Sequence, residues 1–156
     1  MKDQLDQIAI KQSLIEQCEE FVQQKIDVAE KLMNEAQDSA NNETKSSAGD
    51  KFETGRAMMH AERDKNAQQL SEAMKVKMQL DRLKRAESSE KVTFGSVVMT
   101  SFGNYFVSIS AGRIFVDDEK YFAISPQAPL AKSFLQKEVG DVVDFNDQKI
   151  KILEVF

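Results

Sequence analysis

The sequence of 156 residues has little cysteine, proline and glycine, and each shortage excludes a class of protein. Cys18 is the only cysteine, so disulfide bonds cannot hold the fold as they do in small secreted proteins. With 6 glycines and 2 prolines, the chain is neither collagen-like nor a disordered chain dominated by these residues. We therefore expect a fold that depends on packing alone.

Long apolar runs and an excess of basic residues are also lacking. No run approaches the roughly 20 apolar residues that cross a bilayer, and no signal-peptide segment follows Met1. We expect a soluble, cytoplasmic protein with no membrane partner. The 21 basic residues against 26 acidic ones give a net charge of -5, so phosphate backbones should repel the chain on average. Unaided nucleic-acid binding is disfavoured.

The first part of the sequence has a helical pattern. Residues 4–37 contain no glycine or proline, and their apolar residues recur in sevens, as do those of residues 51–86. Two helices of about 35 residues, each about 50 Å long, are predicted, joined by a polar loop or frayed tip at about 38–50. Residues 1–86 should thus form an antiparallel coiled-coil hairpin.

The pattern changes after a polar linker at 87–90. The aromatic and β-branched residues then alternate with polar ones, which is typical of strands. We expect an α+β protein in which residues 91–156 form an antiparallel meander, one short helix and two closing strands. The predicted strands are 91–100, 104–110, 113–116, 120–124, 141–145 and 149–156, and the predicted helix is 129–136.

Three strings, in this order of parts, carry a resemblance to a known family. They are Phe-Glu-Thr-Gly-Arg at 52–56, Val-Thr-Phe-Gly-Ser-Val-Val at 92–98, and Ala-Pro-Leu-Ala-Lys-Ser-Phe-Leu-Gln-Lys-Glu-Val-Gly-Asp-Val-Val at 128–143. The last is similar to the family string Ser-Pro-Leu-Ala-x-x-Leu-Leu-x-Lys-x-Val-Gly-Asp-x-Val. The chain resembles the Gre transcript-cleavage family of bacterial transcription elongation factors (GreA/GreB), which has anti-Gre-like relatives that inhibit polymerase.

The resemblance implies an FKBP-like C-terminal domain that docks on bacterial RNA polymerase while the hairpin enters the secondary channel. In the family, an acidic pair at the tip helps to hold a Mg²⁺ ion shared with the polymerase, which then cleaves backtracked RNA. The factor contacts the nascent RNA 3′ end only indirectly and is not a stand-alone enzyme. It binds no cofactor stably, and we expect a monomer.

The same resemblance suggests site residues. Counted back from Phe52, the acidic pair falls on Ala36 and Ser39, and the nearest carboxylates, Asp38 and Glu43, are the candidate metal ligands. The candidates for partner binding are Pro129, Leu130, Ala131 and Arg56.

Other functions stay open. Because the tip departs from the family pattern, a channel regulator that does not stimulate cleavage, or that inhibits, is one alternative. A peptidyl-prolyl isomerase is a second, since FKBP-like folds host that activity, although fold does not establish function. A coiled-coil adaptor that dimerises through its hairpin is a third. His60 has no second histidine or nucleophile beside it, and Cys18 lies on an apolar row, so neither indicates catalysis.

Overall fold

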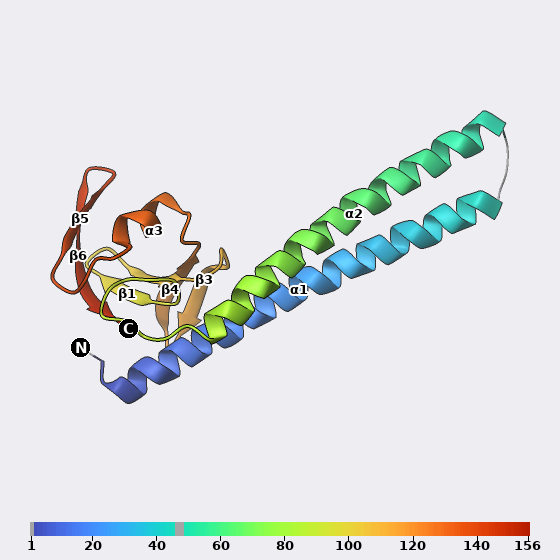
Figure 1. Cartoon of the computed structure of the whole chain (residues 1–156). Helices are drawn as coiled ribbons and strands as arrows, with labels where there is room; N and C mark the ends of the chain where they lie inside the picture. Colours follow the sequence, from blue (N-terminus) through green and yellow to red (C-terminus); the bar gives the residue numbers. More distant parts are fainter. Residues whose placement is uncertain (1, 46–48) are drawn as a thin grey trace. The chain divides into compact units, whose positions relative to one another are not determined.

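The chain is described from a computed structural model that covers residues 2–45 and 49–156, without the side chains at 40 and 43–52. It is an α+β structure, as predicted, with two long helices before a sheet and a short helix (Figure 1). The elements are α1 (Gln4–Lys45), α2 (Gly49–Lys84), β1 (Val97–Thr100), β2 (Asn104–Val107), β3 (Gly112–Val116), β4 (Glu119–Ile124), α3 (Pro129–Phe134), β5 (Val142–Phe145) and β6 (Gln148–Val155).

The chain forms two compact units. The base unit combines Met1–Glu20 with Met78–Phe156, so it contains the sheet and the open end of the hairpin, and the distal unit is Phe21–Lys77. Each unit therefore has its own packing.

Both long helices extend further toward their connection than predicted. We expected a loop or frayed tip across 38–50, yet α1 continues to Lys45 and α2 begins at Gly49, while 46–48 lie outside the described residues. Residues 38–48 are polar but include no glycine or proline to end a helix. The Nε2 of Gln37 also donates to Oδ1 of Asn41 at 3.0 Å, a pair of the kind that supports a helix four residues apart. The loop prediction was thus wrong for most of this segment.

The distal unit is a two-helix seam of mostly small side chains. Five apolar residues are buried there: Val22, Ile26, Ala29, Ala36 and Ala73. Polar groups join the helices as well, because Nδ2 of Asn66 donates to the Leu32 carbonyl at 3.2 Å. Arg63 Nη1 donates to Oε1 of Gln37 at 3.0 Å. From the first pair to the second, the residue number rises from 32 to 37 on α1 and falls from 66 to 63 on α2. The two helices are therefore antiparallel, which confirms the predicted hairpin.

The sheet has the strand order β3-β4-β2-β1-β6-β5. All neighbouring strands are antiparallel except β2 and β4, which are parallel. The predicted meander is therefore wrong at one point, since β4 rather than β3 lies beside β2. Asp117 and Asp118, with φ of 49° and 66°, form a tight turn that joins β3 to β4 as one hairpin. The more exposed strand of that hairpin, β3, occupies the edge.

The first strand is shorter than predicted because a glycine turns the chain. Gly95 has φ of +96°, and β1 begins only at Val97. A Cβ at Gly95 would lie 2.8 Å from the Cβ of Ala86, so only glycine lets this turn approach the end of α2. The residues before β1 pair elsewhere, since the Val92 amide donates to the Lys137 carbonyl at 2.8 Å.

Both faces of the sheet are covered within the base unit. On the α3 side the core contains Val92, Val98, Tyr105, Val107, Phe134, Val143, Ile150 and Ile152. Phe106 alternates to the other face and is also fully buried. On that face α1 reaches the strands, because Nε2 of Gln17 donates to the Phe115 carbonyl at 2.9 Å. The thiol of Cys18, itself fully buried, is hydrogen-bonded to Ser108.

Candidate functional site

The candidate metal ligands lie near the end of α1. Asp38 is exposed, and Glu43 belongs to α1 but its side chain lies outside the described residues. On one continuous helix, positions 38 and 43 are about 140° apart around the axis and about 7.5 Å apart along it. The Glu43 carboxylate lies outside the described side chains, so the shared Mg²⁺ site stays a prediction. Among the side chains that the structure describes, no group of three or more histidine, cysteine or acidic residues could hold a metal.

The positions that match the family's acidic pair do not carry metal ligands. Ala36 is buried in the hairpin seam, and Ser39 is exposed. Glu35, which we did not single out from sequence, precedes Asp38 by three residues and therefore shares its face of α1. Its Oε1 lies 4.0 Å from Nζ of Lys31. The three-residue spacing, one position upstream of the expected pair, was the signal that could have identified it.

Arg56 lies on the outer part of α2 and is exposed. Its Nε donates to Nε2 of His60 at 3.3 Å, four residues further along the helix. His60 thus accepts a hydrogen bond within the hairpin surface. Arg56 keeps a guanidinium on this surface that a partner can reach.

The three residues predicted to dock on a partner have different surroundings. Pro129 is exposed at the first turn of α3, where its missing N–H costs no helical hydrogen bond. Leu130 is half-buried and packs against the core. Ala131 is fully buried and packs beneath α3. Of the three residues, Pro129 is the exposed one.

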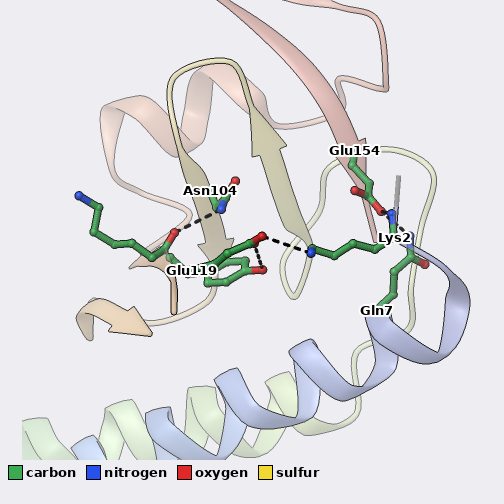
Figure 2. A network of polar contacts seen from close by, with 7 residues as sticks. Lys2, Gln7, Asn104, Glu119 and Glu154 are labelled. Carbon is green, nitrogen blue, oxygen red and sulfur yellow. Dashed lines mark hydrogen bonds and ion pairs between the residues drawn. The ribbon is translucent and has the colours of Figure 1, made fainter. Parts of the chain in front are cut away.

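A polar network at the start of α1 was not predicted. Glu154 on β6 is only 6% exposed, and its Oε1 accepts hydrogen bonds from the Lys2 backbone amide at 3.0 Å and from Nε2 of Gln7 at 2.9 Å (Figure 2). Lys2 Nζ also lies 3.4 Å from Oε1 of Glu119, whose Oε2 accepts the Tyr121 hydroxyl at 3.1 Å. Burial, and then the Glu119 carboxylate, raise the pKa of Tyr121 above its usual range.

This network joins the start of α1 to the sheet. The hydrogen bonds of Lys2 and Gln7 in this network join residues that are 117 to 152 apart in sequence. No local pattern predicts pairing over such a separation. Its chemistry is structural, because each carboxylate oxygen involved accepts from a group of this chain. It sets the position of the hairpin's open end on the sheet within the base unit.

No family model matches the chain, and no curated protein matches it. In the described part of the chain, no helix has the length and apolar character to cross a membrane.

Proposed function

We propose that this chain is a Gre-like factor that binds bacterial RNA polymerase through its secondary channel and regulates elongation. The observation that supports this most is the distal unit, in which the described residues all belong to two antiparallel helices. A helix with its side chains is about 10–12 Å wide, so a two-helix rod is narrow enough for a channel that excludes a globular domain. Enzymatic activity of its own is not part of the proposal.

In this proposal the base unit is the FKBP-like domain that docks on the polymerase. The strings at 92–98 and 128–143 that resemble the Gre family meet in one core, where Val92 packs with Phe134 and Val143. The Gln136 amide also donates to the Val92 carbonyl at 2.8 Å, which joins the two strings directly. Two segments that are distant in sequence therefore share one core, which supports their assignment to a single docking domain. In this proposal Pro129 and Arg56 contact the polymerase.

Stimulation of cleavage would need carboxylates at the tip, and two pairs can supply them. The pair predicted from sequence is Asp38 with Glu43, and the second is Asp38 with Glu35, which share one face of α1. A regulator that does not stimulate cleavage needs neither pair.

The test is binding and cleavage with the cognate polymerase. Binding of labelled protein to core polymerase is measured first, with Pro129→Asp expected to weaken it. RNA cleavage in a stalled, backtracked complex is then compared for wild type, Asp38→Asn, Glu35→Gln and Glu43→Gln, with Glu30→Gln as a control on the same helix. Glu30 is exposed and lies more than one turn from these positions.

The outcomes separate the hypotheses. Binding without cleavage supports a non-cleaving or inhibitory regulator, and cleavage lost in Asp38→Asn supports the transcript-cleavage role. No binding to polymerase would overturn the proposal. In that case a dimer by sedimentation would indicate the adaptor, and faster proline-limited refolding of a test protein would indicate the isomerase.

A further inference from the structure

The row of α1 residues that faces α2 continues beyond the end of α2. In the distal unit this row includes Val22, Ala29 and Ala36, all buried in the seam. Seven and fourteen residues before Val22 lie Ile15 and Ile8, which belong to the same row. Lys84 is the last residue of α2, and its side chain forms an ion pair with Glu19 of α1. The end of α2 therefore lies beside Glu19, and the turns of α1 before Glu19 have no helix opposite them.

Within the base unit, α1 runs on past this point beside the segment that leads to the sheet (Figure 1). The overhang from Gln4 to Gln17 is about 20 Å long, or nearly four turns. Its other face is occupied, because Ile10, Leu14 and Cys18 are buried. One side of the overhang is therefore packed and the other is open.

The open side is a groove of about 960 Å³, which we call the base groove. Its apolar lining comes from Ile8, Ile15, Leu83, Ala86, Val155 and Phe156. Its charged lining consists of Lys11 and Lys84 with Glu16, Glu19 and Glu90, and the serines of the 88–89 linker also line it. Ile8 is 57% exposed although it belongs to a row that is buried further along, and both isoleucines of the row line the groove. Together they offer an apolar row of the kind on which a second helix packs.

Lys11 lies midway between the two isoleucines, three residues after Ile8 and four before Ile15. Its Nζ is 6.0 Å from the centre of the Phe156 ring. No carboxylate of the described side chains forms an ion pair with it, whereas Lys84 nearby is paired. Burial lowers the pKa of Lys11, so the groove holds a partly desolvated cation that a carboxylate would stabilise.

We propose that the base groove binds an amphipathic helix of a partner protein, one that carries two apolar residues seven apart with an aspartate or glutamate between them. The apolar residues would pack on Ile8 and Ile15, and the carboxylate would meet Lys11. Such a helix takes the place that a longer α2 would fill, as in helix-in-groove recognition. The groove shares no residue with Pro129 or Arg56, so this inference does not depend on polymerase binding.

The probe is a designed, alanine-rich helical peptide with two leucines seven apart and a glutamate between them. Its binding to the full chain is measured by fluorescence anisotropy, beside an otherwise identical peptide with lysine in place of glutamate. We expect the glutamate peptide to bind about tenfold more tightly, because it meets Lys11 with opposite charge. Lys11→Glu should reverse that preference.

Ile8→Glu should weaken binding of the glutamate peptide by at least about tenfold. The matched control is Val28→Glu, since Val28 is 58% exposed on the distal unit and lies outside the groove. Circular dichroism checks that both variants keep their helices.

Equal binding of the two peptides, an unchanged affinity in Ile8→Glu, or no binding of either peptide would overturn the proposal. A dimer of the chain that disperses in Ile8→Glu but not in Val28→Glu would also overturn it, because the occupant would then be a second copy.

Discussion

The base unit and the distal unit bury side chains of very different size. In the base unit Tyr121, Phe106 and Phe134 are fully buried on the two faces of the sheet. Among the described side chains of the distal unit, the largest buried ones are Val22 and Ile26, beside alanines. Because burial of apolar area is the main stabilising term, the base unit should hold its structure while the distal hairpin opens locally. A chain can thus combine a firm anchor with a narrow, adaptable arm.

The largest effect on stability is expected when a large core side chain of the base unit is removed. Phe134→Ala empties a fully buried site in the α3-side core, and we expect a loss of about 3–5 kcal/mol in the free energy of unfolding. The measurement is urea denaturation followed by circular dichroism. Phe115→Ala is the control, because Phe115 is 55% exposed and should cost less than about 1 kcal/mol. Similar losses in both variants would contradict the assigned core.

Cutting the network at the start of α1 should have the next largest effect. Glu154→Ala removes the acceptor for Lys2 and Gln7, and hydrogen bonds to a charged group contribute about 1.5–3 kcal/mol. Hydrogen exchange should show faster opening of residues 4–20, while residues 21–77 keep their rates. Glu138→Ala, at an exposed carboxylate, is the control. Unchanged exchange at the start of α1 would show that the network does not hold it.

Alkaline pH should weaken the base unit more than the distal unit. The folded-state pKa of Tyr121 is raised, so its contribution to stability is complete below about pH 10, the usual tyrosine pKa, and falls as pH rises further. Burial raises the pKa of the Cys18 thiol to about 11, which adds a loss of the same sign from about pH 9. Tyr121→Phe should flatten the decline between pH 10 and 12 in urea denaturation. An equally steep decline in the variant would count against this role.

The smallest effect is expected in the distal seam. Asn66→Ala removes the hydrogen bond to the Leu32 carbonyl and should cost about 1 kcal/mol or less. Hydrogen exchange of residues 21–77 is the sensitive measurement, since global unfolding is governed by the base unit. Gln69→Ala, at an exposed position of the same helix, provides the reference. If the base unit exchanged faster than the distal seam, the distal unit would be the more stable of the two.

Local patterns predicted the elements well, because they depend on residues close in sequence. Seven-residue periodicity predicted both long helices, and the Asn146-Asp147 pair, with φ of 50° and 63°, forms the turn between the two predicted closing strands, β5 and β6. The end of α1 was missed because polar residues without glycine or proline remain compatible with a helix.

Pairings between distant segments could not be predicted in this way. Which strand lies beside β2 depends on which strand is buried on both faces, and the arrangement of the whole sheet decides this. Local patterns therefore could not predict the parallel pairing of β2 with β4. The burial of Ala131 could not be predicted either, because a small apolar residue near a proline looks the same in sequence whether α3 buries it or exposes it. The partners of Glu154 lie at the other end of the chain.

The hydrogen bond between Lys2 and Glu154 has a consequence for synthesis on the ribosome. This bond joins residues that are 152 apart, so the first turns of α1 cannot dock on the sheet until β6 has emerged. The two helices of the distal unit are adjacent in sequence and emerge well before β6. We therefore expect the hairpin to form first during translation, and the base unit to close only when β6 has joined the sheet.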